Sequence, residues 1–363
     1  MKISVVIPTK NRVPDLKECL DTLVAQTRIP DEVIIVDNST NDETKEYINQ
    51  WKHPEILQCI YIRRERGGTS SLRNTGIDRS TGDIVFFLDD DVILHVDYVR
   101  IITEILLGDT AERIGGAAGV GGWDLKDIGT IGLGVPRDLK ELVNKGDEFS
   151  QRLRQLVIER YGRDIFEQSN IEYLIWSGAK WMRDLIGTVF LIKSFRKGRV
   201  LASGFRSDFP RSTTRAPFVR VDTLPGCNCF RRKVLLEYRF EENLEIFPYA
   251  VGEDQELCMR VAKKYMLAAT SRAIFIHKRS PGARIDSRKQ FISIIANHHY
   301  IVTRNMNRPI NRACFWWAVF GISLSCLVRL VLRPSKESWL SFVGCVQGVK
   351  LALRQSGHHI PAT

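Results

Sequence analysis

The sequence predicts an α/β fold, a doubly wound and mostly parallel sheet flanked by helices, followed by an apolar and basic helical tail. Three observations predict it. Short apolar runs alternate with helical patterns through the first 110 residues, polar side chains follow several of these runs directly, and composition changes sharply after residue 291. The length of 363 residues is enough for about two domains of ordinary size.

The first 110 residues alternate between predicted strands and helices. Residues 3–7 form an unbroken apolar run, as expected of a strand that is covered on both faces. Leu16, Leu20, Leu23 and Val24 follow at helical spacing. The further elements are strands at 32–36, 60–62 and 83–88, a helix at 41–50 with Asn or Asp as its cap, and a helix at 70–79 after Gly67 and Gly68.

The middle of the chain has less regular patterning. Residues 115–134 are glycine-rich and predict loops, residues 138–187 predict helices, and residues 195–220 are basic and irregular. We interpret this stretch as an insert that shapes the site of the second substrate, with Trp176, Trp181, Phe205 and Arg206 as candidates. Regular structure resumes with a strand at 227–230, a helix at 253–265 and a strand at 273–276.

The tail combines an apolar run with dense positive charge. Between Arg312 and Arg333 lie 20 residues of which only Arg329 is charged, which is just long enough to span about 30 Å of hydrocarbon. On a helix, Gly321, Ser325 and Arg329 form one narrow polar stripe, which suits a helix in the membrane interface or one packed on another helix. A second helix is predicted at 339–353, after a turn at 334–338. Residues 310–353 are therefore predicted to contact a membrane surface, although spanning by 313–332 and packing of a helical pair on the protein core remain alternatives.

Charge distribution and cysteine usage limit the kinds of partner, metal site and compartment that this protein can have. Residues 1–190 hold 24 Lys and Arg against 31 Asp and Glu, whereas residues 191–363 hold 29 against 11. The basic half predicts an anionic partner: lipid headgroups, a phosphorylated substrate or nucleic acid. The eight cysteines form no C-x-x-C pair, which disfavours a zinc site. The first apolar run is too short for a secretory signal, so we expect a cytoplasmic protein with reduced thiols.

Three consecutive carboxylates are the strongest chemical signal. Asp89, Asp90 and Asp91 directly follow the apolar strand, at the sheet edge where α/β folds bind ligands. In an extended segment Asp89 and Asp91 point to one side and Asp90 to the other. Two carboxylates on one side suit a hard divalent ion that also binds phosphate oxygens. A helix cap or a solvated turn is the structural alternative.

Four further places carry candidate chemistry. Glu253 and Asp254 open a helix, where acids serve as ordinary caps, yet in a cleft one of them could accept a proton. Asp37 follows a strand and predicts either an Asx turn or recognition of a base or ribose. Arg73, on the helix after the glycine pair, suits phosphate contacts or simply a solvated face. His277 follows a strand among basic residues and could bind a metal or a phosphate, or be structural.

Several common catalytic motifs are absent from the sequence. It contains no Walker A motif, no G-x-G-x-x-G after a strand and no G-x-S-x-G elbow. Aromatic residues do not interleave with the basic ones in the pattern of a nucleic-acid module.

Taken together, five segments resemble the family 2 glycosyltransferases, which are inverting enzymes with the GT-A fold. The segments are SVVIPTKNR at 4–12, EVIIVDNST at 32–40, SLRNTGIDRSTGDIVFFLDDDV at 71–92, LPGCNCFRRKVL at 224–235 and GEDQELCMRV at 252–261. The resemblance implies a nucleotide-binding half at 1–110 and a half that carries the catalytic base at 226–290. The acceptor-shaping insert at 111–225 and the helical, membrane-associated tail at 291–363, both predicted from composition, lie outside the family motifs.

The resemblance also implies roles on the donor side of the site. Pro8, Thr9 and Arg12 would line the nucleotide site, Asp37 would hold the base, and Arg73 would approach the nucleotide. Asp89 would contribute both to this site and to the metal.

On the catalytic side, Asp89 and Asp91 match a D-x-D motif that binds Mn²⁺ or Mg²⁺, with Asp91 as the direct ligand. His277 would add a further metal or diphosphate contact. Asp254 matches the catalytic base, with Glu253 beside it.

The implied activity is metal-assisted transfer of one sugar from a nucleotide-sugar donor to a hydroxyl of a glycan or lipid-linked acceptor, in cell-surface polysaccharide or glycolipid synthesis at the cytoplasmic face of a membrane. Processive family members carry Q-x-x-R-W, whereas this chain reads HHYIVTRNM with Arg304 and no Trp, which favours single additions. No nucleic-acid partner is expected. The alternatives are a sugar-nucleotide-forming nucleotidyltransferase, whose glycine-rich Arg-Pro loop is missing here, and a non-catalytic nucleotide- or nucleic-acid-binding protein.

Overall fold

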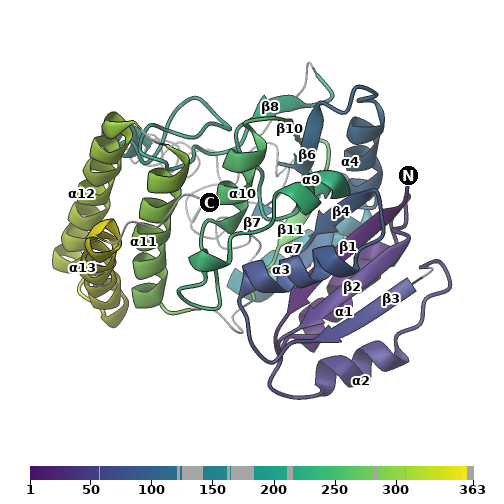
Figure 1. The fold of residues 1–363 in the computed structure, drawn as a ribbon. Helices are drawn as coiled ribbons and strands as arrows, with labels where there is room; N and C mark the ends of the chain where they lie inside the picture. The colour runs from purple at the N-terminus through teal and green to yellow at the C-terminus, as the bar shows by residue number, and fades with distance from the viewer. Residues whose placement is uncertain are drawn as a thin grey trace.

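The computed structural model describes residues 1–56, 58–120, 123–124, 142–161, 164, 184–210, 216–280, 285–306 and 308–357. The predicted α/β fold is confirmed: a mixed sheet has the strand order β3-β2-β1-β4-β9-β6-β10-β8 and is flanked by helices (Figure 1). A second sheet has the order β5-β11-β7.

The first half follows the predicted alternation. The parallel strands are β1 (Ile3–Thr9), β2 (Glu32–Asp37), β3 (Gln58–Arg63) and β4 (Ile84–Phe87), and the helices are α1 (Val13–Val24), α2 (Glu43–Gln50) and α3 (Thr69–Arg79). The predicted cap of α2 is wrong, because Asp42 stands at its N-cap without a side-chain capping hydrogen bond.

Strand β1 is buried on both faces, as its unbroken apolar sequence predicts. Val5 belongs to the apolar cluster that contains Leu16 and Leu20 of α1. Its neighbour Val6 belongs to the cluster on the other face, with Leu72 of α3. Because successive side chains of a strand point to opposite faces, one apolar run joins two cores and holds the polar ends of β1 and β4 at one edge.

The second half corrects two predictions. The glycine-rich stretch begins with a buried strand, β6 (Ile114–Gly119), and not with a loop. The helix predicted to reach residue 265 is α10 (Glu253–Val261), and the residues after it form an unpredicted strand, β10 (Met266–Thr270). The other strands are β8 (Val219–Val221) and β9 (Asn228–Arg231), of which β9 runs antiparallel between β4 and β6.

Small residues allow β6 to lie at the centre of the sheet. A Cβ on Gly116 would lie 2.5 Å from Cδ1 of Phe230 and 2.9 Å from the carbonyl oxygen of Cys229. Gly116 is therefore present because β9 passes close by, and not because the chain turns.

Gly116→Ala is expected to lower the free energy of unfolding by about 1–3 kcal/mol, since the new methyl group overpacks a closed core. Denaturant unfolding would measure the change. Gly108→Ala is the control: Gly108 ends α4 (Tyr98–Leu107) with a helical φ of −66°, so its replacement should leave stability unchanged or slightly higher. Equal stability of the two variants would contradict the packing argument.

The second sheet brings a strand from the second half of the chain next to the loop that follows β4. It contains β5 (Val92–Leu94), β7 (Trp123–Asp124) and β11 (Phe275–His277), so the strand predicted at 273–276 begins two residues later. In the antiparallel pairing His277 lies opposite Val92. The remaining elements outside the tail are α7 (Glu148–Tyr161), α9 (Arg232–Glu237) and the short 3-10 helix η2 (Glu242–Leu244).

The tail consists of three helices, one more than the sequence predicts. They are α11 (Ser287–Asn305), α12 (Pro309–Leu332) and α13 (Lys336–Gly357), which lie side by side at one end of the molecule (Figure 1). Helix α13 begins inside the predicted turn. By length and composition α12 is apolar enough to cross a membrane, with a mean hydropathy of 1.9 over 18 residues, of which 28% are buried in the protein.

Candidate functional site

A pocket of about 390 Å³ lies at the carboxyl ends of β1 and β4, between the two halves of the chain. All of the predicted site residues except Asp37 line it: Pro8, Thr9, Arg12, Arg73, Asp89, Asp91, Glu253, Asp254 and His277. A larger groove of about 1160 Å³ lies beside α4 and β10 and contains none of them. The positions of the predicted site residues therefore identify the smaller cavity as the candidate site.

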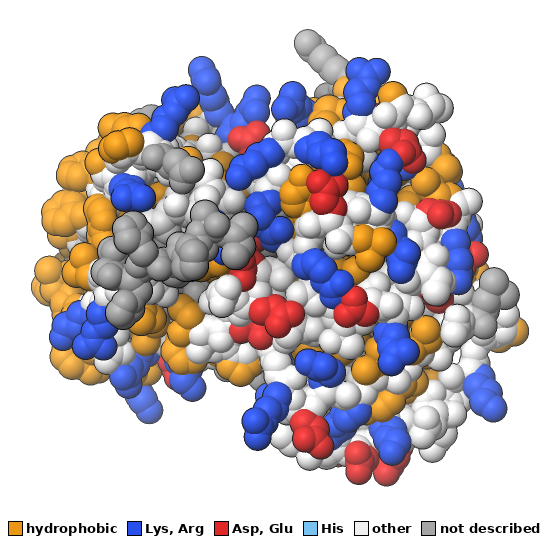
Figure 2. Space-filling view, in the orientation of Figure 1, with side chains coloured by type: hydrophobic (Ala, Val, Ile, Leu, Met, Phe, Trp, Pro, Cys, Tyr) orange, Lys and Arg blue, Asp and Glu red, His pale blue; other side chains and the backbone are white. Residues whose placement is uncertain are grey.

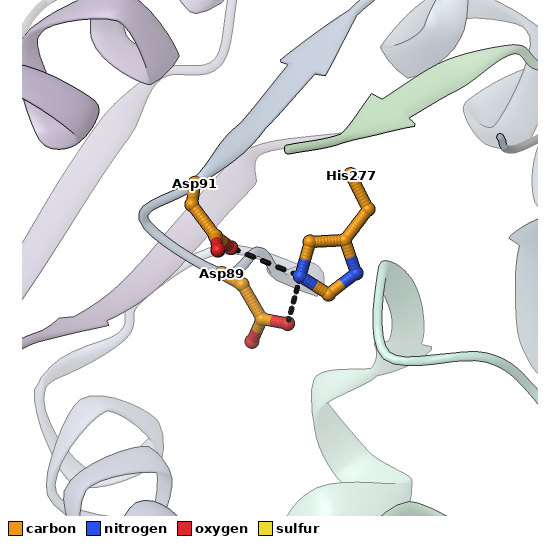
Figure 3. Close-up of side chains that lie close together, drawn as sticks. All are labelled: Asp89, Asp91 and His277. Atoms are coloured by element: carbon orange, nitrogen blue, oxygen red, sulfur yellow. Dashed lines mark ion pairs between the residues drawn. The ribbon is translucent and has the colours of Figure 1, made fainter. Parts of the chain in front are cut away.

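Asp89, Asp91 and His277 converge from two different sheets (Figure 3). Their ligand atoms lie within 4.8 Å of one another. Nε2 of His277 is 3.0 Å from Oδ1 of Asp91 and 3.8 Å from Oδ2 of Asp89. The backbone N–H of Ser280 donates to Oδ2 of Asp91 at 3.0 Å, which orients that buried carboxylate. Two carboxylates and an imidazole are donors that fit a divalent cation such as Mn²⁺ or Mg²⁺.

Asp90 points away from this group, as the alternation of an extended segment predicts. Its carboxylate accepts a hydrogen bond from Oγ1 of Thr9 at 2.8 Å and pairs with Nη1 of Arg12 at 2.9 Å. Burial raises the pKa of Asp90 to about 7, against the opposing effect of Arg12. The middle aspartate therefore ties β1 to the acidic loop and leaves its two neighbours to face the pocket.

Arg73 joins the acids of the two halves. It comes from α3, is buried, and donates from Nη1 to Asp254 at 2.8 Å and to Glu253 at 3.1 Å. Its Nη2 donates to Oδ1 of Asp89 at 3.2 Å, and its guanidinium carbon lies 5.2 Å from the centre of the Phe240 ring. Both terminal nitrogens of the guanidinium therefore donate to protein carboxylates beneath the pocket, whereas its buried Nε has no hydrogen-bond partner among the described residues.

Glu253 and Asp254 are adjacent at the start of α10, where Glu253 is the more deeply buried of the two. Burial and the neighbouring Asp254 carboxylate raise the pKa of Glu253 to about 8, so Glu253 carries a proton at neutral pH. Oδ1 of Asp254 accepts from Arg73 and, at 3.3 Å, from Nδ2 of Asn228. A Cβ on Gly226 would lie 3.7 Å from Oδ2 of Asp254 and 3.6 Å from Oδ2 of Asp89. These two oxygens therefore face the same space above Gly226.

Arg73→Met is expected to lower the free energy of unfolding by about 3–5 kcal/mol near neutral pH, because it removes the buried cation that Asp89, Glu253 and Asp254 share. The difference from the wild-type protein should shrink as pH falls, because protonated acids no longer need a cation. Urea unfolding at several pH values would measure it. Arg79→Met, an exposed position on the same helix, is the control and should change stability by less than about 0.5 kcal/mol.

Asp37 lies behind the pocket rather than in it. Its buried carboxylate accepts hydrogen bonds from the Tyr61 hydroxyl at 2.8 Å, from Nη1 of Arg63 at 3.0 Å and from the backbone N–H of Ser39 at 2.8 Å. The neighbouring Asn38 lines the pocket instead.

The start of α3 is closed by the protein itself. Glu245 accepts hydrogen bonds from the backbone N–H groups of Gly68 at 2.8 Å and Ser71 at 2.7 Å. The helix N-terminus after the glycine pair, a natural anion site, is therefore occupied by a side chain that lies far along the sequence.

The pocket also contains residues from irregular segments that carry no sequence periodicity. They are Phe209, Tyr249 and Arg279, together with Arg206. Of the two acceptor-site candidates that the structure describes, Arg206 lines the pocket and Phe205 does not. Phe205 instead stacks on the ring of His298 with a centroid distance of 4.3 Å, while Trp176 and Trp181 lie outside the described residues.

Comparison with known families identifies the chain. Residues 4–130, which include the acidic triplet and α1 to α4, match the family model described as glycosyl transferase family 2. The N-terminal third of the chain is thus similar to this family. A curated relative, glycosyltransferase AglE of Haloferax volcanii, is 34% identical over 116 residues, which are 31% of this chain and 38% of AglE.

A second curated relative matches a longer stretch of the chain. It is the poly(ribitol-phosphate) β-N-acetylglucosaminyltransferase TarP of Staphylococcus aureus, 28% identical over 202 residues, which are 53% of this chain and 58% of TarP. The chain thus spans less than two thirds of the length of these relatives.

A solved structure has the same fold. The mannosyltransferase PcManGT of Pyrobaculum calidifontis, in complex with GDP-Man and Mn²⁺, superposes with a TM-score of 0.51 at 16% identity and covers 98% of this chain and 87% of its own.

Proposed function

We propose that this chain is an inverting glycosyltransferase that moves one sugar from a nucleotide-sugar donor to a hydroxyl of a glycan or lipid-linked acceptor. One observation carries the proposal. One pocket contains both the group of Asp89, Asp91 and His277 and the Oδ2 atom of Asp254. It lies at the edge of the sheet, where both halves of the chain contribute residues. Such a pocket can hold a charged leaving group and an attacking hydroxyl next to each other.

The leaving group of a nucleotide-sugar is a diphosphate, whose negative charge grows as the sugar departs. Asp89, Asp91 and His277 would hold a divalent cation there, which would supply positive charge to the diphosphate oxygens. The neighbour PcManGT is a complex with GDP-Man and Mn²⁺, which supports a donor and a cation of this kind. Pro8, Thr9 and Arg12 line the same side of the pocket and would bound the nucleotide.

Asp254 is the group that can act as a general base. Its Oδ1 is held by Arg73 and Asn228, while within the described residues its Oδ2 accepts no hydrogen bond and faces the pocket. Oδ2 would take the proton of the acceptor hydroxyl as this oxygen attacks the anomeric carbon from the side opposite the diphosphate. Burial raises the pKa of Glu253, and this side chain would hold α10 to Arg73 by accepting the hydrogen bond that Nη1 of Arg73 donates at 3.1 Å.

The relatives and the tail support this choice of acceptor. TarP is named for action on poly(ribitol-phosphate), which supports a glycan or glycan-like acceptor at the cell surface. Helix α12 leaves a large apolar surface exposed, which supports work at the cytoplasmic face of a membrane as a peripheral or integral protein.

A thermal-shift panel with product analysis tests the function. We expect stabilisation by a nucleoside diphosphate together with Mn²⁺ or Mg²⁺ and little by either alone. With a nucleotide-sugar and an acceptor, mass spectrometry should detect one added hexose or related sugar. Release of pyrophosphate from a nucleoside triphosphate and sugar phosphate would instead identify a nucleotidyltransferase. Salt-sensitive stabilisation by DNA or RNA alone would identify a nucleic-acid-binding protein.

A further inference from the structure

The outer face of α12 is the largest group of exposed apolar side chains among the described residues. We call it the α12 face and define it by Trp317, Phe320, Leu324, Leu327, Val328, Val331 and Leu332, which are 39–74% exposed. Figure 2 shows hydrophobic side chains gathered at the end of the molecule formed by the tail helices. An exposed apolar patch of this kind marks an interaction surface.

The other side of α12 is packed within the protein. Phe315, Ala318 and Cys326 are buried in a cluster with residues of α11 and α13. Helix α11 in turn contacts α10, where a Cβ on Gly252 would lie 3.1 Å from Ile301. Helix α12 is therefore attached through α11 to the helix that carries Asp254, and only one of its faces is available to lipid. A helix that is apolar on one side and attached to a folded domain on the other suits the membrane interface.

A groove of about 830 Å³ runs along this face and combines an apolar wall with positive charge. Ile186, Phe190, Leu324, Val328 and Leu332 form the wall, and Arg329 and Arg333 lie at its edge. Neither arginine forms an ion pair with any acid in the described part of the chain. An apolar channel beside two unpaired guanidinium groups matches a molecule with a hydrocarbon chain and a phosphate headgroup.

We propose that the α12 face docks onto a bilayer that contains anionic phospholipid, with α12 lying in the plane of the interface and not across the membrane. One lipid then lies in the groove, its hydrocarbon chain along the Phe190 and Val328 wall and its phosphate at Arg329 and Arg333. This inference rests on the membrane contact in the proposed function and names the surface and the lipid chemistry that provide it. It also places the lipid surface next to the catalytic half, on the side of α11.

Co-sedimentation of the full chain with vesicles tests the docking surface. We expect binding to vesicles of phosphatidylglycerol and phosphatidylcholine, and a loss of at least tenfold in affinity for the Leu324→Asp/Val328→Asp variant. Leu107→Asp is the matched control: Leu107 is 52% exposed at the end of α4, away from the tail (Figure 1), and should bind as the wild-type protein does. Unchanged binding of the double variant overturns the proposal.

Two further measurements separate the lipid from other occupants. Arg329→Gln/Arg333→Gln should weaken binding to anionic vesicles at least threefold, while 10-fold excess inorganic phosphate over lipid should not release the wild-type protein. If light scattering shows a dimer without lipid that Leu324→Asp/Val328→Asp dissociates, the face is an interface between two copies and the lipid proposal fails. A third outcome would indicate that α12 spans the membrane instead. In that case the protein stays in the membrane pellet after an alkaline carbonate wash, and only lipids brominated at the bilayer centre quench the fluorescence of Trp317.

These outcomes are independent of the sugar-transfer chemistry. Each variant should keep its stabilisation by a nucleoside diphosphate with Mn²⁺, because none of the substituted residues lines the catalytic pocket. Loss of vesicle binding with an intact nucleotide response, or the reverse, therefore distinguishes failure of the docking surface from failure of the proposed activity.

Discussion

Asp254→Asn is expected to reduce the turnover of sugar transfer by about 10²–10⁴-fold, which is the usual contribution of general-base catalysis. The amide keeps the shape of the side chain and can still accept from Arg73, but it cannot take up a proton from the acceptor hydroxyl. Affinity for the donor should change little, because Asp254 is not one of the three residues proposed to hold the cation. Steady-state transfer assays with varied donor and acceptor would measure kcat and KM separately.

Glu253→Gln is the matched control for this experiment. Because burial keeps Glu253 protonated at neutral pH, an amide imitates its normal state, and turnover should fall by less than about tenfold. If Glu253→Gln removes activity while Asp254→Asn retains most of it, the two residues have exchanged roles and the assignment of Asp254 is wrong.

Asp91→Asn is expected to abolish metal-dependent binding of the nucleotide and to lower transfer on the order of 10³-fold, corresponding to several kcal/mol of charge stabilisation. Asp91 is the buried member of the candidate metal group, held by Ser280 and adjacent to His277. Isothermal titration with Mn²⁺, with and without a nucleoside diphosphate, would measure the effect directly. It does not require the acceptor to be known.

The neighbouring aspartate provides the contrast. Asp90→Asn should retain the response to Mn²⁺, because Asp90 faces Thr9 and Arg12 and lies outside the metal group. Equal loss of the response in both variants would mean that the whole acidic loop, and not one pair of carboxylates, determines binding.

Elements with a strong apolar period were predictable, and elements that depend on neighbours were not. β1 and α1 have clear apolar patterns and form where they were expected. The glycine-rich sequence of β6 predicted a loop. The segment is a strand, and Gly116 is needed there because the Phe230 ring packs against it. Helix α11 has a weak apolar period because His298 and Asn297 are buried within it, and their partners lie in other segments.

The candidate site divides in the same way. The side chains of Asp89, Asp90 and Asp91 alternate in direction because of local backbone geometry, so the sequence alone predicted this alternation. Arg73 could be selected, but its contacts with Glu253 and Asp254, 180 and 181 residues away, depend on how the two halves meet. Asp37 reads as a ligand-binding acid, yet Tyr61 and Arg63 of the next strand surround it.

By itself the sequence determined that a parallel sheet would present carboxylates at its carboxyl edge, since period and strand length depend only on adjacent residues. It also determined that the tail would be apolar and basic. Only the tertiary structure decided which acid keeps its proton, which arginine holds the acids in place and which face of α12 stays exposed. Those properties depend on burial and on distances between segments that are remote in the chain, and chain folding alone brings such segments together.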